Sequence, residues 1–225
     1  MSKRLLRVTI ESIEVFSNGD VPGQHPPPGE EKRNAVVASL TYPRSGAPSI
    51  TSAQQFNIPA GIAFSPDQSD FFACGLFKEE VQDETILQIK VTDTVRSAKA
   101  ERFVLNVLSM LAGSALGAAT EGLTTFLGAI AGVGVGLVRS GFANANSGDQ
   151  VFIIGETDRI KLEVDSLPAD PAQPLRMNLS LIVREEVRKP FIELDSAGQP
   201  VHKEIVLRAG SHNGNILIKL SAAPV

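Results

Sequence analysis

Apolar and polar residues alternate along much of the chain with the period of a β-strand. Residues 7–16 alternate in this way, and residues 84–94 (ETILQIKVTDT) place Leu87, Ile89 and Val91 on one face. Successive side chains of a strand point to opposite sides, so one face of each segment is available for a core. We therefore predict a strand over each segment, with one buried face.

The same pattern returns in further segments that are separated by turn residues. They are AVVASLTYP at 35–43, VFIIGETDRIKLEVDSLP at 151–168, LRMNLSLIVREEV at 175–187, PFIELDSAGQPVHKEIVLRA at 190–209 and GNILIKLSA at 214–222. Asp195-Ser-Ala-Gly, between two alternating stretches, indicates a hairpin turn. Several short strands with turns between them predict a mainly β fold, namely an antiparallel β-sandwich.

The middle of the chain departs from this pattern. Two stretches, Phe103–Thr120 and Leu123–Val138, contain no ionised residue. We predict that they form two helices of about 17 residues joined at Glu121, a length at the lower limit for crossing a bilayer. The predicted organisation is a sandwich in two parts with an apolar two-helix hairpin inserted between them, in the order 1–95, 96–145 and 146–225.

Two strand segments beside this insertion resemble a known family. ILQIKVTDT at 86–94 is similar to the strand that enters the third loop of the protein-kinase-C-type calcium- and lipid-binding β-sandwich domain. GDQVFIIGETDRIKLEVDSLP at 148–168 resembles the strand that leaves that loop. In that family the third loop touches the membrane, so the resemblance implies that a much longer apolar segment replaces a lipid-contacting loop.

The resemblance also implies a candidate calcium site. Asp93 and Asp149 fall at loop positions that hold calcium in the family, and Asp20 falls in the corresponding first loop. The second acid of the family's Asp-x-Asp motif is missing, because position 95 is Val. Calcium takes about six to eight oxygen ligands, so carbonyl groups and water would have to complete this set. The alternative is that all three are ordinary turn aspartates.

Glycines recur at four-residue spacing in both predicted helices. Such GxxxG repeats allow close helix contact, which offsets a helix-propensity cost of about 1 kcal/mol per glycine relative to alanine. We therefore assign the predicted hairpin as an interface through Phe103, Leu111, Gly113, Gly117, Glu121, Phe126, Gly128, Gly132 and Gly136. Basic residues flank it where it joins the sandwich, a placement that suits anionic lipid headgroups; they are Arg96, Lys99, Arg102 and Arg139.

These features lead to two functional hypotheses. The first is a non-enzymatic module that docks on a lipid membrane or inserts into it as a pore-forming element, with self-association into a homo-oligomer as one route. The second is a soluble structural or interaction protein whose hairpin is buried against a partner or in a homo-oligomer. The chain has no Trp, and no Tyr lies near the hairpin, so the aromatic belt typical of membrane interfaces is missing.

The composition of the chain bears on its partners, its disulfides and its location. The formal net charge is -4, the pI is about 5.5 and no basic block occurs, which argues against a nucleic-acid partner. Cys74 is the only cysteine, so no intrachain disulfide forms, and its apolar surroundings in FFACGLF predict a buried small side chain. The first residues lack the apolar core of a secretory signal, so we expect a cytoplasmic or membrane-associated location.

No catalytic residue is predicted. The three histidines, His25, His202 and His212, lack the spacing of a zinc site. GSALG is not the G-x-S-x-G nucleophile motif, and GVGVG lacks the Lys-Ser/Thr of a phosphate-binding P-loop. A hydrolase-like enzyme is therefore the third and least favoured hypothesis.

Overall fold

The computed structural model describes residues 3–18, 34–42, 50–82, 84–94, 151–194, 196 and 198–225. Its strands are β1 (Arg4–Val15), β2 (Asn34–Thr41), β3 (Ile50–Phe56), β4 (Gly75–Val81), β5 (Glu84–Thr94), β6 (Val151–Glu156), β7 (Ile160–Glu163), β8 (Leu175–Ile182), β9 (Val187–Leu194), β10 (Pro200–Leu207) and β11 (His212–Pro224). Two short helical turns accompany them, α1 (Phe71–Cys74) and the 3-10 turn η1 (Val164–Ser166).

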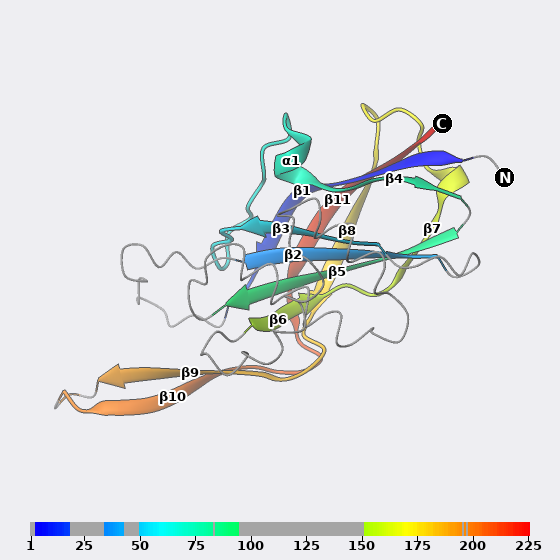
Figure 1. Cartoon of the computed structure of the whole chain (residues 1–225). Coiled ribbons are helices and arrows are strands. Elements are labelled where there is room, and N and C mark those ends of the chain that lie inside the picture. The colour runs from blue at the N-terminus through cyan, green and yellow to red at the C-terminus, as the bar shows by residue number, and fades with distance from the viewer. Residues whose placement is uncertain are drawn as a thin grey trace, which may run out of the picture.

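Nine strands form one antiparallel sheet that is nearly closed into a barrel (Figure 1). The strand order is β3-β2-β5-β6-β8-β11-β1-β4, and β7 pairs with the beginning of β5. The first and last strands of the chain, β1 and β11, are neighbours over almost their whole length. The two edge strands meet at a seam, where the Gln54 side chain of β3 donates a hydrogen bond to the Gly75 carbonyl of β4 at 2.9 Å.

The interior of the sheet is filled by the apolar faces that alternation predicts. Leu87, Ile89 and Val91 of β5 are fully buried, as predicted. Equivalent residues of the terminal strands pack into the same core; they are Leu6, Val8, Ile10, Ile216, Ile218 and Leu220. Burying one such side chain contributes about 1.5–3 kcal/mol, so the contact between the chain ends is a main source of stability.

One glycine permits the contact between β1 and β11. Gly214 has φ 140°, and a Cβ built there would lie 2.0 Å from the carbonyl oxygen of Glu14. It lies beside Val15 in a stretch of β11 where the pairing register with β8 shifts. A side chain at this position would push the two strands apart.

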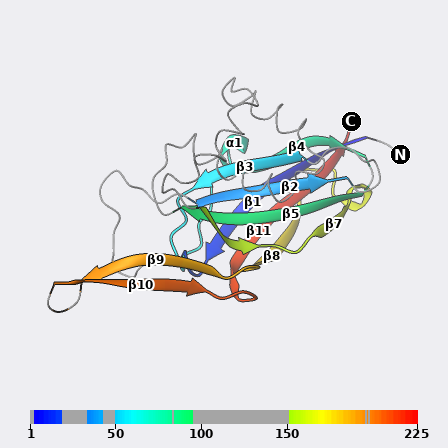
Figure 2. The ribbon, with the colours of Figure 1, turned by 60° about the horizontal axis from the view of Figure 1, so that its bottom comes forward.

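The strands β9 and β10 form a separate two-stranded sheet that projects from one end of the barrel (Figures 1 and 2). They pair from Val187 with Leu207 to Leu194 with Pro200. The hairpin predicted over residues 190–209 is confirmed. Lys189, near its base, is buried, whereas Arg188 beside it is exposed.

The predicted fold, a sandwich with an inserted two-helix hairpin, is wrong. Nine of the described strands form one nearly closed sheet instead of two stacked sheets, and the described residues contain no two-helix hairpin. Alternation determines which face of a strand is buried, but it does not determine which strand edges pair, so it does not separate a sandwich from a barrel. Residues 103–138, on which the helical prediction depended, lie outside the described residues.

The helical prediction depended on the absence of charge and on the spacing of glycines. Both are compositional features, and glycine is itself a poor helix former. The membrane-related interpretation depended on the same helices. Over the ranges that the structure describes, no helix has the length and apolarity needed to cross a bilayer.

Candidate functional site

A small pocket lies on the outer face of β1 and β11. Arg7 and Thr9 alternate along β1 with buried core residues, so both side chains point away from the interior. In the antiparallel pairing, Arg7 lies opposite Ser221 and Thr9 lies opposite Lys219. The four side chains therefore form a compact block on one face, drawn from the two ends of the sequence.

Two loops complete the pocket, whose volume is about 130 Å³. Gln68 and Cys74 come from the connection between β3 and β4, and Pro171 and Pro174 come from the segment before β8. The Gln68 amide donates to the carbonyl of Ile10 at 2.9 Å and fastens the first loop to β1. The pocket thus combines strand residues with a loop that the sheet itself holds in place.

Local sequence determines the shape of the loop that carries Cys74. Asp67 accepts hydrogen bonds from the backbone and hydroxyl of Ser69, which lower the pKa of Asp67. Asp70 accepts a hydrogen bond from the Phe72 N–H at 2.9 Å and so caps α1. Glycine is needed at position 75, directly after this turn, because a Cβ there would lie 2.5 Å from the Phe71 carbonyl oxygen.

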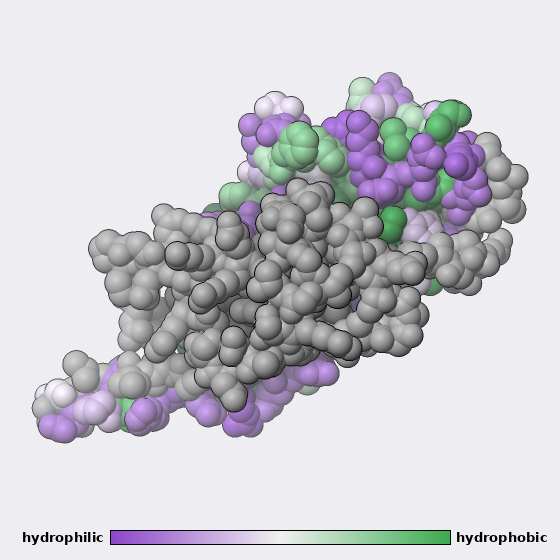
Figure 3. All heavy atoms as spheres, viewed as in Figure 1, coloured by the Kyte–Doolittle hydropathy of each residue, from purple (hydrophilic) through white to green (hydrophobic). Residues whose placement is uncertain are grey.

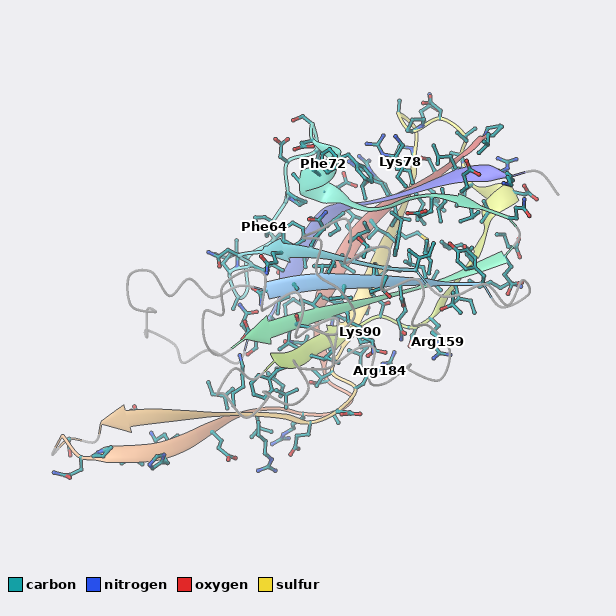
Figure 4. The ribbon with its side chains drawn as sticks, viewed as in Figure 1. Phe64, Phe72, Lys78, Lys90, Arg159 and Arg184 are labelled. Carbon is teal, nitrogen blue, oxygen red and sulfur yellow. The ribbon has the colours of Figure 1, made fainter. Side chains whose placement is uncertain are left out.

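Positive charge gathers at the pocket. The Arg7 guanidinium lies 5.0 Å from the centre of the Phe71 ring and forms no ion pair with any described residue. Lys78 is the cross-strand partner of Arg7 in β4, which pairs with the edge of β1 that faces away from β11. Figure 4 shows Lys78 on the same side of the barrel as Phe72 of α1. Lys78 does not line the pocket, but like charges at paired positions of a sheet repel each other, so it adds positive charge beside Arg7.

Lys219 is the second cation of the pocket. Its Nζ donates to Gln68 Oε1 at 3.0 Å and lies 3.6 Å from Glu11 Oε1. The other oxygen of Glu11 lies 2.9 Å from Arg176 Nε. Since Glu11 is shared between two cations, it neutralises Lys219 only in part, and the pocket keeps a net positive charge.

Two hydroxyl groups of the pocket have no internal partner. Thr9 is 7% exposed and Ser221 is 4% exposed. Neither hydroxyl hydrogen bonds to any residue that the structure describes. Neither oxygen is among the fully buried, unpartnered side-chain atoms of the described residues, so both hydroxyls open onto the pocket and are accessible to a ligand. A bound oxygen-rich group would satisfy both hydroxyls.

Cys74 lines the pocket but is not activated. The side chain is buried, as predicted. Burial raises the pKa of the Cys74 thiol, an effect that Arg7 and Lys219 only partly oppose. A thiol that stays protonated at neutral pH is a weak nucleophile, so the geometry favours binding over thiol catalysis.

Exposed apolar residues are scattered over the described surface. Figure 3 shows hydrophilic and hydrophobic residues interspersed over the described part of this face. Phe72 of α1 is largely exposed, and Ile62 in the preceding loop is exposed as well. These single exposed apolar residues are ordinary for a folded surface.

A second polar cluster lies inside the barrel near the base of the projecting hairpin. It contains Asp93, Lys189, Asn34 and Asn18, all buried. Lys189 Nζ contacts Asp93 Oδ2 and also donates to the backbone carbonyl of Asn18. The Asn34 side chain donates to Asp93 Oδ1 at 3.2 Å. This cluster is the opposite of the pocket, because its charges are paired with each other.

The cluster shows where one predicted calcium ligand lies. The carboxylate of Asp93 is bound by the ammonium group of Lys189. The other two predicted ligands, Asp20 and Asp149, lie outside the described residues, so the calcium hypothesis stays a prediction. Within the described ranges, no group of three or more acidic, His or Cys side chains has the arrangement of a metal site.

The remaining predicted site residues also lie outside the described residues. This holds for the predicted interface, Phe103, Leu111, Gly113, Gly117, Glu121, Phe126, Gly128, Gly132 and Gly136, and for the basic flank, Arg96, Lys99, Arg102 and Arg139. The strands on either side of this segment, β5 and β6, are antiparallel neighbours, and Asp93 lies opposite Phe152.

No match was found among protein-family models, curated proteins or solved structures.

None of the pocket residues was predicted as a site residue, and for Cys74 only its burial was predicted. Arg7, Thr9, Lys219 and Ser221 stand at the polar positions of alternating strands, where solvent exposure is the usual explanation. The only signal in the sequence was that both terminal strands carry a cation next to a hydroxyl residue on one face. That signal has meaning only once β1 and β11 are known to pair.

Proposed function

We propose that this protein is a binding module that holds the anionic group of a small molecule, a carboxylate or a phosphate, in the pocket between β1 and β11. The observation that carries the proposal is the convergence of Arg7, which lacks an ion-pair partner among the described residues, with the unpartnered hydroxyls of Thr9 and Ser221. Lys219 supplies a second positive charge at the same pocket.

The chemistry of these groups supports an oxyanion ligand. A guanidinium offers a planar set of donors that matches carboxylate and phosphate, and an ammonium adds a point charge. Hydroxyl groups donate to the remaining oxygens. The volume of about 130 Å³ accommodates a small group and not an extended chain.

Calorimetric titration of the full chain with inorganic phosphate and with acetate tests the proposal. We expect saturable binding of at least one of them, and we expect Arg7→Gln and Ser221→Ala to weaken it. A hydrogen bond to a charged group contributes about 1.5–3 kcal/mol, so the loss for Arg7→Gln is roughly 10- to 100-fold in affinity.

The matched control is Lys203→Gln. Lys203 forms an exposed ion pair with Glu193 on the projecting hairpin, so its removal lowers the positive charge by the same amount at a distant place. Equal weakening by Arg7→Gln and Lys203→Gln would show general charge screening and would contradict the proposal. Failure of both phosphate and acetate to bind would contradict the proposal as well.

A further inference from the structure

The buried cluster at the base of the projecting hairpin joins three strands that are far apart in the sequence. Asn34 begins β2, Asp93 lies near the end of β5, and Lys189 belongs to β9. Asn34 and Asp93 are direct partners in the pairing of β2 with β5. The exposed fractions are 1% for Asn34, 1% for Asp93 and 5% for Lys189, so water has little access to any of them.

One carboxylate bridges an amine and an amide. Asp93 Oδ2 contacts Lys189 Nζ, and Asp93 Oδ1 accepts a hydrogen bond from Asn34 Nδ2 at 3.2 Å. The lysine nitrogen and the asparagine amide therefore lie against the two oxygens of the same group. The Phe152 ring, with its centre 5.7 Å from Lys189 Nζ, provides an apolar side to the cluster.

The carbonyl of the Asn34 side chain is held and polarised. Its Oδ1 accepts a hydrogen bond from the Ile58 N–H at 3.1 Å. The Ile58 carbonyl accepts in turn from Asn18 Nδ2 at 2.8 Å, which fixes this stretch of backbone. A fixed N–H directed at a carbonyl oxygen stabilises the negative charge that develops there when a nucleophile attacks the carbon.

We propose that this cluster forms an isopeptide bond between Lys189 Nζ and Asn34 Cγ, with Asp93 as the proton carrier. The Lys189 ammonium passes one proton to the Asp93 carboxylate, and the free amine attacks Asn34 Cγ. The Ile58 N–H stabilises the oxyanion at Oδ1. Asp93 transfers its proton to Nδ2, and the C–Nδ2 bond breaks.

The reaction needs no oxidant and no cofactor. As the new C–N bond forms, the Lys189 nitrogen releases a second proton. The leaving ammonia takes up this proton and departs as ammonium. The sum is one ammonium side chain and one carboxamide converted to one amide and one ammonium ion. Because Lys189 and Asn34 are held on the two oxygens of one carboxylate, much of the entropic cost of bringing them together is already met.

The bond would fasten the projecting hairpin to the barrel. Lys189 is near the base of β9, and an isolated two-stranded hairpin is only marginally stable in water. A covalent link from β9 to β2 would hold that base in place. This inference is independent of the proposed anion pocket, which uses none of these residues.

Intact mass measurement of the purified, denatured full chain tests the inference. We expect a mass lower than that of the sequence by one ammonia molecule, and proteolysis should yield one branched peptide that joins Asn34 to Lys189. Lys189→Arg keeps the charge but cannot form the bond, and Asp93→Asn keeps the size but cannot carry the proton, so both should have the full mass of their sequences. Lys203→Arg, the control on the same hairpin, should lose ammonia like the parent chain.

Each other outcome overturns the inference. An unchanged mass means that Lys189 and Asp93 are a plain ion pair. Loss of water in place of ammonia means that Lys189 joins Asp93. Ammonia loss confined to a single unbranched peptide indicates a local ring closure at an Asn-Gly pair, such as Asn213-Gly214. If a variant fails to fold, the mass and the branched peptide of the parent chain still show whether the isopeptide bond forms.

Discussion

The outer pocket and the inner cluster contain similar chemical groups in opposite states. In the pocket, the guanidinium of Arg7 and two hydroxyls lack partners among the described residues and border a space. In the cluster, Lys189, Asp93 and Asn34 satisfy one another inside the barrel. We therefore assign the open groups of the pocket to the proposed ligand, and the mutually paired groups of the cluster to an internal structural or chemical role.

The largest expected effect comes from breaking the inner cluster. Asp93→Ala leaves the Lys189 ammonium buried without its carboxylate, which costs about 3–5 kcal/mol. Arg188→Ala is the control, since Arg188 is exposed and pairs with Glu186 and Glu204 at the surface, where such pairs contribute about 0–1 kcal/mol. Urea denaturation measures both. Similar losses in the two variants would contradict the distinction between the inner and outer charges.

A smaller loss is expected when the two terminal strands that form the pocket are forced apart. Gly214→Ala introduces a Cβ that meets the Glu14 carbonyl, and its backbone conformation is strained, so we expect a loss of about 1–3 kcal/mol together with weaker anion binding. Gly61→Ala is the control, because Gly61 also has a positive φ, 72°, but has open space around it. Thermal unfolding measures the stability of both variants. Equal losses would mean that the whole cost comes from backbone strain and none from the contact between the strands.

Removing an unpartnered hydroxyl should separate stability from binding. Thr9→Val replaces the hydroxyl with a methyl group of similar size, and no hydrogen bond to a described residue is lost. We expect a change in unfolding free energy within about 0.5 kcal/mol and a several-fold loss in affinity for the anion. A clear destabilisation without any effect on binding would mean that the hydroxyl has a structural role.

The smallest effect concerns a buried hydroxyl that lies outside the pocket. Tyr42 is the only tyrosine of the sequence, and its buried hydroxyl has no hydrogen-bond partner among the described residues. Burial, assisted by Glu79, raises the pKa of Tyr42 to about 12. Because the folded state favours the protonated phenol, this stability is fully present below pH 10.0, the ordinary pKa, and is lost as the pH rises through about 12.

Titration by ultraviolet absorbance follows this single phenol. The folded chain should ionise at higher pH than the same chain in denaturant. Coincident curves would show that Tyr42 is open to water, and the contrast between its buried hydroxyl and the pocket hydroxyls would then fail.

The sequence predicts the strands better than their arrangement. The alternation at Leu87, Ile89 and Val91 identifies the buried face of β5, because side-chain burial is a local consequence of strand geometry. The pairing of β1 with β11 is decided by contacts between the two ends of the chain, which no local pattern encodes. A sandwich was predicted for that reason, and the closed arrangement was missed.

Asp93 was predicted as a calcium ligand, but its pairing with Lys189 was missed, and so was the pocket, for the same reason. Asp93 and Lys189 are separated by 96 positions, and each alone is an ordinary charged residue of a strand. Their burial becomes apparent only when the base of β9 is placed against the end of β5. Likewise, Thr9 and Lys219 share one face only through the register of the terminal strands. Long-range pairing therefore creates both the pocket and the cluster.

The most direct test of the central claim is to map the anion on the molecule. Backbone amide NMR of the full chain, titrated with inorganic phosphate and separately with acetate, reports which residues sense the ligand. The account predicts saturable shifts centred on Arg7, Thr9, Cys74, Lys219 and Ser221, and their disappearance in Arg7→Gln. Shifts spread evenly over exposed lysines and arginines, or centred on the projecting hairpin, would contradict it.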